Sequence, residues 1–256
     1  MSQFGQELSP NDAPALPLWI DGHAYLLMAE QFHTVVNGKG DALRRVPLYG
    51  DDAVAIAASS TEKAVLTWGQ MPENDRAQCF VALHELLGRF RGHLGKLLEE
   101  EAGMSHELAE IELAQSLAAI AGRSPALSSE ARVAAVSSDA LAPLAAPLTC
   151  VVDALAAGWG VVLKPSTKAP SALFALAEVF SRAGFPAGLI NCVHGDEEAM
   201  RALCASPKVS LLAFVGADKI AQRIASMAGE HNKPCVVGVP DAALQDAWRK
   251  ALGAGS

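Results

Sequence analysis

The chain has 256 residues, of which 51% are hydrophobic and 19% are charged, and its formal net charge is −8 at pH 7. A chain of this length and apolar content can bury its own core, which excludes a disordered protein. The acidic balance argues against nucleic acid or an anionic membrane as the main partner, because both are bound through basic patches.

The five cysteines are widely spaced and form no Cys-x-x-Cys motif. This pattern argues against a disulfide framework or a structural zinc site, so we expect reduced thiols, no metal and a cytoplasmic location. The amino terminus lacks the basic and apolar regions of a signal peptide. The apolar runs are too short to cross a bilayer, so we expect no membrane insertion.

Residues 1–17 are rich in Ser, Pro, Asn and Asp and are expected to form a flexible tail. Residues 18–47 contain short apolar pieces separated by Asp21-Gly22 and Asn37-Gly38, which predicts one or two small hairpins. Their inward residues are expected to be Trp19, Ile20, Val35, Val36, Leu43 and Val46.

From residue 51 to residue 123 the hydrophobic period becomes helical. One apolar stripe is formed by Phe80, Leu83, Leu87, Phe90, Leu94 and Leu97. Six carboxylates occur between Glu99 and Glu112, and we interpret them as a solvated helix face with a turn at Gly103.

Five short apolar runs follow, and segments of helical period separate them. The runs cover residues 133–136, 161–163, 189–193, 211–215 and 235–239. Short strands without alternation, separated by amphipathic helices, are typical of a parallel sheet covered on both faces. The sequence therefore predicts an α/β fold: an open Rossmann-type sheet of about five strands with flanking helices, preceded by a small hairpin and a helical segment.

Several segments resemble aldehyde dehydrogenases. Residues 154–158 (ALAAG) and 163–166 (LKPS) are similar to ALAAGN-x-VVLKPS of that family, and residues 183–195 to AGLPAGVLNVVHG. Residues 214–217 stand where the family carries FTGS. The resemblance implies one dinucleotide-binding domain over 18–256, with hairpin and helices at 18–123 and the Rossmann core at 131–256, and no catalytic domain.

The resemblance also implies a chemistry whose parts can be sought one by one. The family uses a cysteine thiolate, a glutamate-activated water and an asparagine in the oxyanion hole. The cysteine segment would follow the last residues of this sequence, and whether Ser256 is the native end stays open. No Glu lies between Pro234 and Val239, where ELGGK is expected, and no Asn lies in residues 138–143, which correspond to PWNFP. We therefore expect no catalytic residue, and we expect Cys235 to be a buried structural cysteine.

The implied cofactor site is only partly kept. Its residues would be Lys164, Ser166, Thr167, Gly195, Phe214, Gly216, Ala217 and Ile220. In the family the lysine bonds the adenosine ribose, whereas Ala217 here replaces the serine at the pyrophosphate. Losing a hydrogen bond to a charged phosphate costs roughly 1.5–3 kcal/mol. We expect no cofactor or weakly bound NAD(P). Thr167 stands where NAD-preferring members of the family have a glutamate, and this smaller side chain leaves room for the 2′-phosphate of NADP, which is the weaker guess.

Three functional hypotheses remain open. The first is an aldehyde dehydrogenase-like pseudoenzyme that acts as a structural or regulatory subunit, with a full-length aldehyde dehydrogenase or another oxidoreductase as its partner. The second is an NAD(P)-binding sensor without turnover, and the third is an oxidoreductase active only with a second chain.

Residues 123–131 are too short for the family's oligomerisation hairpin, and the sheet face that would meet a catalytic domain is expected to be an apolar interface. We interpret Cys192 as a residue packed in the core and His194 as a histidine at the surface, and not as a pair of metal ligands.

Overall fold

The computed structural model describes residues 13–123, 125 and 132–253. Its main sheet has seven strands in the order β2-β1-β7-β6-β5-β8-β9, and a separate two-stranded sheet pairs β3 with β4. The strands are β1 (Leu18–Ile20), β2 (His23–Tyr25), β3 (Phe32–Val36), β4 (Ala42–Pro47), β5 (Val133–Ser138), β6 (Gly160–Lys164), β7 (Ile190–Cys192), β8 (Val209–Val215) and β9 (Cys235–Gly238). The helices are α1 (Asp51–Gln70), α2 (Glu73–Ala102), α3 (His106–Ile120), α4 (Ala145–Ala156), α5 (Ser171–Arg182), α6 (Glu197–Ala205), α7 (Asp218–Glu230) and α8 (Ala242–Ala251).

The five strands from β5 to β9 are parallel, and each is followed by one helix. Strands β5 and β6 are buried at every position, because helices cover both faces of the sheet. The prediction of an open parallel sheet of about five strands with flanking helices is therefore confirmed.

The first hairpin belongs to the main sheet. Strand β1 pairs antiparallel with β2 and also with β7, where Trp19 faces Cys192. The turn between β1 and β2 places Asp21 and Gly22 at φ values of 53° and 77°, which glycine adopts without a steric cost. The hairpin thus extends the parallel sheet at one edge, so the sheet has seven strands instead of five.

The second hairpin, β3–β4, follows the predicted turn at Asn37-Gly38. Val35 and Val46 are buried as predicted, but Val36 is 46% exposed. This part of the prediction is wrong because the alternation of a strand sends Val36 to the face opposite that of Val35.

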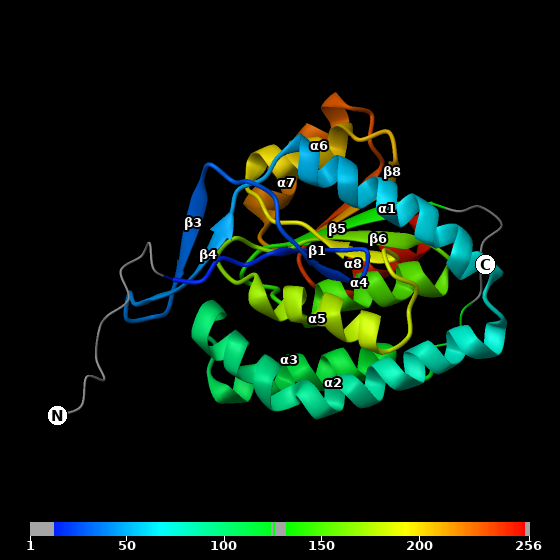
Figure 1. The fold of residues 1–256 in the computed structure, drawn as a ribbon, viewed down its shortest axis with the longest axis horizontal. Helices are drawn as coiled ribbons and strands as arrows, with labels where there is room; N and C mark the ends of the chain where they lie inside the picture. Colours follow the sequence, from blue (N-terminus) through cyan, green and yellow to red (C-terminus); the bar gives the residue numbers. More distant parts are fainter. Residues whose placement is uncertain (1–12, 124, 126–131, 254–256) are drawn as a thin grey trace.

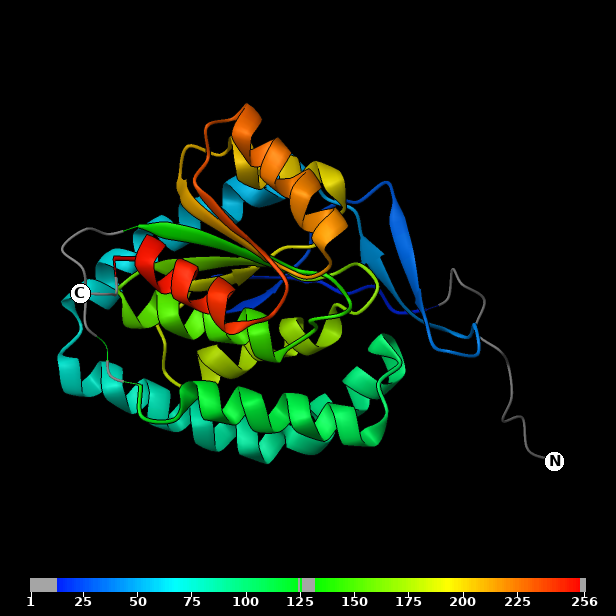
Figure 2. The ribbon, with the colours of Figure 1, turned by 180° about the vertical axis from the view of Figure 1, so that it is seen from behind.

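The sheet lies between two helical layers (Figure 1). Helices α1, α6 and α7 cover one face, and α4, α5 and α8 cover the other, with α2 and α3 packed outside α4 and α5. Figure 2 shows α8 beside α4 on the second face. All five helices that follow the parallel strands begin at the edge where those strands end.

The apolar stripe of α2 packs as predicted, with Phe90 partly buried, and the helix ends at Gly103 with a φ of 66°. The predicted solvated carboxylate face is wrong at two positions. Glu101 is buried and accepts a hydrogen bond from Ser171 N at 2.9 Å, and Glu112 accepts one from Ala145 N at 2.7 Å. Both carboxylates reach backbone N–H groups at the starts of other helices, which a periodicity argument does not see.

Residues 13–17, expected to end a flexible tail, instead run along β4. Leu16 N donates to Arg45 O at 2.9 Å, and Arg45 N donates to Pro14 O at the same distance. The rest of that tail, residues 1–12, and most of residues 123–131, the stretch expected to be too short for an oligomerisation hairpin, lie outside the described residues. Among the helices described, none is both long and apolar enough to cross a membrane.

Candidate functional site

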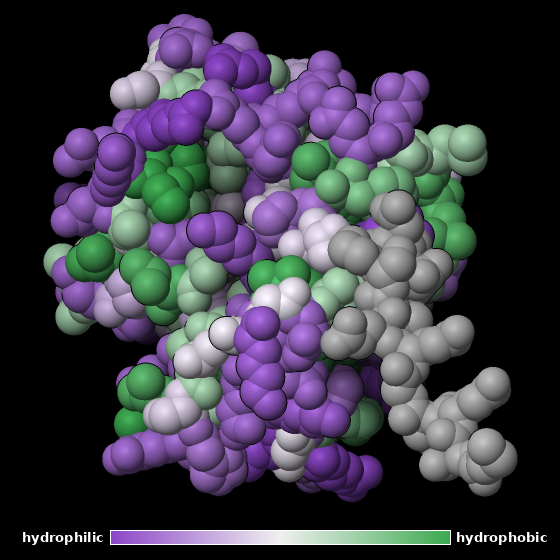
Figure 3. Space-filling view, turned by 90° about the vertical axis from the view of Figure 1, so that its left-hand side faces the viewer, coloured by the Kyte–Doolittle hydropathy of each residue, from purple (hydrophilic) through white to green (hydrophobic). Residues whose placement is uncertain are grey.

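A cleft of about 460 Å³ lies at the carboxyl ends of β5, β6 and β8. Figure 3 views the molecule from this side and shows a hollow bordered by hydrophobic and hydrophilic side chains. Its walls come from the loops after these strands and from α6 and α7. In a doubly wound sheet this edge is the usual place of a ligand site.

Six of the eight residues predicted from the resemblance line this cleft. They are Lys164, Ser166, Thr167, Phe214, Ala217 and Ile220. Gly195 and Gly216 are not among the lining residues. Gly195 has a φ of 152°, and a Cβ there would lie 2.5 Å from Ala199 Cβ and would overlap Tyr49 O. Close packing against Tyr49 therefore explains this glycine without a ligand.

Lys164 ends β6 inside the cleft, and its side chain is buried. Its Nζ donates to Pro165 O at 3.4 Å, a long hydrogen bond for an ammonium group. Burial lowers the pKa of Lys164 to about 8, and the nearby Asp196 carboxylate opposes this shift. The ammonium therefore lacks much of the hydration that it would have in water, and it could donate to a ligand.

Asp139 follows β5 and crosses the cleft to the start of α7. Its Oδ2 accepts a hydrogen bond from Ala217 N at 2.7 Å, and its Oδ1 accepts one from Leu141 N at 2.9 Å. A helix start carries partial positive charge and favours an anion. Here that anion is a side chain of the protein itself.

Ser138 lies beside Asp139 and is 4% exposed. Its hydroxyl oxygen has no hydrogen-bond partner among the described residues, and Ser138 lines the cleft. A buried hydroxyl without a partner is costly and calls for an explanation. An apolar wall completes the cleft, with Met200, Phe214, Ile220, Ile224 and Met227.

The charged groups of the cleft largely face one another. Glu197 pairs with Arg223 in the cleft and with Arg201 at 3.3 Å. Asp196 accepts a hydrogen bond from Glu198 N at 3.1 Å and so caps α6. Lys168, which is exposed, is the remaining cation among the lining residues.

The structure describes two segments that the resemblance aligns with catalytic motifs, residues 138–143 and 234–239. Leu141, in the segment corresponding to PWNFP, is 72% exposed. Cys235 begins β9 and is only half-buried, so the prediction of a buried cysteine is wrong. The reason is that β9 pairs with β8 alone and forms the sheet edge. Burial raises the pKa of the Cys235 thiol, which disfavours a thiolate.

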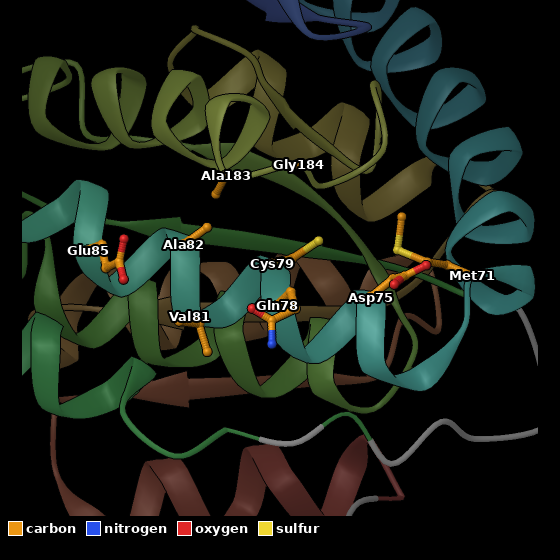
Figure 4. A pocket seen from close by; sticks show the side chains of 9 residues that line it. All are labelled: Met71, Asp75, Gln78, Cys79, Val81, Ala82, Glu85, Ala183 and Gly184. Atoms are coloured by element: carbon orange, nitrogen blue, oxygen red, sulfur yellow. The ribbon is translucent and has the colours of Figure 1, made fainter.

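A second hollow, of about 480 Å³, lies between α2 and the end of α5 (Figure 4). Its Cys79 side chain points toward Ala183 and Gly184, and Asp75 lies one turn away on α2. Burial and the Asp75 charge both raise the pKa of the Cys79 thiol. The groups around this hollow do not form a nucleophilic site.

His194 was expected at the surface, but it is 1% exposed. Its Nε2 donates to Pro17 O at 3.0 Å, and its ring lies 5.8 Å from that of Phe174. Burial lowers the pKa of His194 to about 4. The expectation failed because residues 13–17 cover this histidine. Among the described residues, no three His, Cys, Asp or Glu side chains gather as a metal site.

Asp139 and Ser138 are among the cleft residues that the sequence reasoning missed. The resemblance marked their segment only by a missing asparagine. An aspartate directly after a buried strand, at the edge where helices begin, was the available signal.

Comparison with known proteins finds relatives among the aldehyde dehydrogenases. The sequence model of the aldehyde dehydrogenase family matches residues 142–240. The malonate-semialdehyde dehydrogenase of Pseudomonas aeruginosa is 30% identical over 246 residues, which are 84% of this chain and 49% of that protein. Malonate-semialdehyde dehydrogenase 1 of Geobacillus kaustophilus is 27% identical over 244 residues, which are 83% of this chain and 50% of that protein. The chain thus spans about half the length of these curated relatives.

Solved structures of dehydrogenases also superpose on this chain. A methylmalonate-semialdehyde dehydrogenase of Oceanimonas doudoroffii superposes with a TM-score of 0.79 at 25% identity, over 88% of this chain and 50% of that one. An NAD-dependent benzaldehyde dehydrogenase of Corynebacterium glutamicum superposes with a TM-score of 0.80 at 22% identity, over 87% and 54% of the two chains. The second similarity concerns the fold alone.

Proposed function

Because the chain belongs to the aldehyde dehydrogenase family, we propose that it is a non-catalytic member that serves as a structural or regulatory subunit of an oxidoreductase complex. The observation that carries this proposal is the loop after β5. Where the resemblance expects an oxyanion-stabilising asparagine, the loop presents the exposed Leu141, and its Asp139 is turned inward onto α7. An alkyl side chain cannot donate a hydrogen bond to an oxyanion.

The same edge supports a protein partner. Leu141, Ile220 and Val239 are 72%, 43% and 41% exposed, and they follow or begin elements that meet at the carboxyl edge of the sheet. Leu141 and Ile220 both line the cleft, and exposed apolar side chains that lie together are typical of interaction sites. The partner is proposed to be a full-length aldehyde dehydrogenase or another oxidoreductase. The five unpaired cysteines support a reducing compartment such as the cytoplasm.

An activity assay tests the catalytic half of the proposal. Malonate semialdehyde is the aldehyde named for the relatives from P. aeruginosa and G. kaustophilus, so it is the substrate to offer, with NAD or NADP. We expect no absorbance change from NADH or NADPH formation. Turnover by the purified chain, lost on Cys235→Ser, would contradict the proposal.

A binding assay tests the subunit half. The chain is mixed with a full-length family member from the same organism, and the native mass is measured. We expect a complex that Leu141→Asp abolishes and that Leu66→Asp, an exposed leucine on α1, leaves intact. A chain that stays alone at micromolar concentration with each such partner would contradict this half.

A second candidate function is a nucleotide-binding subunit without turnover. It is favoured by the buried ammonium of Lys164 and the unpartnered hydroxyl of Ser138 in one cleft. A third, an oxidoreductase active with a second chain, would need that chain to supply the thiolate. Activity that appears only in the mixture would support it.

A further inference from the structure

The five helices that follow the parallel strands share one feature at the edge where dinucleotides bind. In each, a backbone N–H at the start of the helix donates to a carboxylate of this same chain. The pairs are Ala145 N to Glu112 at 2.7 Å, Ser171 N to Glu101 at 2.9 Å, Glu198 N to Asp196 at 3.1 Å, Ala217 N to Asp139 at 2.7 Å and Leu244 N to Asp241 at 2.8 Å. These helix starts are the places where an α/β domain would receive a phosphate.

Helices α6 and α7 border the cleft, and α7 is the one that the resemblance assigns to the pyrophosphate. Asp139 reaches Ala217 N there from a loop 78 residues earlier in the chain. A second carboxylate, Asp218, occupies the first turn of α7. The start of α7 therefore already carries negative charge before any ligand arrives.

Gly216 makes room for Asp139. A Cβ at Gly216 would lie 2.5 and 2.7 Å from the two carboxylate oxygens of Asp139, closer than packed atoms come. The backbone of Gly216 is not in the left-handed region, so the glycine is required for space and not for its conformation. The position of the Asp139 side chain thus depends on the absence of a side chain at Gly216. Both residues lie at the carboxyl edge of the sheet.

The residues present do not fit the pyrophosphate of NAD(P). A pyrophosphate at α7 would compete with Asp139 for Ala217 N and would bring negative charge against its carboxylate. Of the three cations that line the cleft, Arg223 is already paired with Glu197, Lys164 lies beside Asp196, and Lys168 is exposed. None of them removes the Asp139 carboxylate from Ala217 N, and the rest of the lining includes the Ser138 hydroxyl and an apolar wall.

We infer that Asp139 is a specificity-determining residue that takes the place of a bound phosphate at α7, so that the cleft selects uncharged ligands, such as a nucleoside, against phosphate-bearing ones. This inference goes beyond the proposed function and rests on the family resemblance for the assignment of α7. It requires no partner protein and no turnover.

Calorimetric titration with adenosine and ADP isolates the phosphate effect, because the two probes differ only in the diphosphate. For the full chain we expect ADP to bind no more tightly than adenosine. In Asp139→Ser, which frees Ala217 N and removes the charge, we expect ADP to gain roughly tenfold or more, the equivalent of one hydrogen bond to a charged group. Asp139→Asn keeps the shape without the charge, and we expect a smaller gain. Adenosine affinity should change less than threefold in both variants.

The matched control is Asp241→Ser, which removes a carboxylate from the start of α8, outside the cleft. It should leave the affinity for ADP unchanged. Unchanged ADP affinity in both Asp139 variants, or an equal gain in Asp241→Ser, would overturn the inference. ADP that binds the unmodified chain at least tenfold more tightly than adenosine would also overturn it. None of these results bears on whether the chain joins an oxidoreductase, which the mixing experiment decides separately.

Discussion

Two polar regions lie at different places on the same sheet, and they use their hydrogen-bonding groups in opposite ways. Around β7, the buried Asn191 places its Nδ2 within 3.1 Å of four oxygen atoms, on Ala57, Ser60, Thr61 and Gly188. Its Oδ1 accepts a hydrogen bond from Asp21 N at 3.0 Å. We call this region, with the neighbouring His194, the β7 network.

The cleft differs in what it leaves unused. Ser138 has a buried hydroxyl without a partner among the described residues, and the contact of Lys164 Nζ to Pro165 O is long. Buried polar groups stabilise a fold when they are satisfied and burden it when they are not. The difference teaches that the β7 network satisfies its buried polar groups within the fold, whereas the cleft contains polar groups that the described residues do not fully satisfy.

The largest expected effect is in the β7 network. Asn191→Ala would leave Asp21 N without its acceptor and would remove the two N–H donors of Nδ2 from the oxygens around it. We expect the free energy of unfolding to fall by about 3 kcal/mol or more, since each buried unpaired group costs about 1–3 kcal/mol. Urea denaturation measures this. The control Asn74→Ala, at an exposed position of α2, should stay within about 0.5 kcal/mol. A loss below about 1 kcal/mol for Asn191→Ala would remove the contrast.

His194 should make the β7 network sensitive to acid. Its pKa of about 4 in the folded chain lies below the ordinary 6.5, so the unfolded chain binds more protons between these values. Its stabilising contribution is complete above pH 6.5 and is lost as the pH falls toward 4, by about 3 kcal/mol. His194→Gln should remove this part of the acid dependence, whereas the exposed His84→Gln should keep it. Parallel acid curves for both variants and the unmodified chain would contradict this assignment.

Gly216→Ala should have an intermediate effect that depends on Asp139. The added methyl group would meet the Asp139 carboxylate, and overpacking of this kind costs about 1–3 kcal/mol. Because the obstacle is a side chain, Gly216→Ala in an Asp139→Ser background should cost less by about 1 kcal/mol. Thermal or urea unfolding of the four proteins gives this coupling. Strict additivity would show that the two residues do not meet.

The smallest effect is expected at Ser138. Ser138→Ala removes a hydroxyl with no partner among the described residues, so stability should change by less than about 0.5 kcal/mol or rise slightly. Ser60→Ala, in the β7 network, removes a hydroxyl that bonds Asp21 and lies 3.1 Å from Asn191 Nδ2. It should cost about 1 kcal/mol. Equal losses at both serines would break the comparison between the two regions.

Much of the fold was predictable because its signal is local. Strands buried on both faces read as continuous apolar runs, and the run at residues 211–215 lies within β8 as observed. The hairpin β1–β2 was found, but its pairing with β7 was not, because a strand carries no local mark of the edge that it joins. The covering of His194 by Pro17 was missed for the same reason.

The cleft was predictable in its position and not in its chemistry. Lys164 and Phe214 were found through the resemblance, and both line the cleft. Asp196 and Asp241 cap helices that they directly precede, a pattern visible in sequence. Glu101 and Asp139 accept hydrogen bonds from backbone N–H groups 70 and 78 residues later, at the starts of α5 and α7. Only the folded chain brings such residues together.

The carboxylates at the starts of the five helices have one more consequence. A domain that leaves those N–H groups for a dissolved nucleotide is stabilised in proportion to the logarithm of the nucleotide's concentration over its dissociation constant. Here the anions are tethered to the chain and present in every molecule at fixed ratio. The N–H groups at these five helix starts therefore have anionic partners whether or not a nucleotide is present, and the part of the stability that they contribute does not depend on nucleotide concentration.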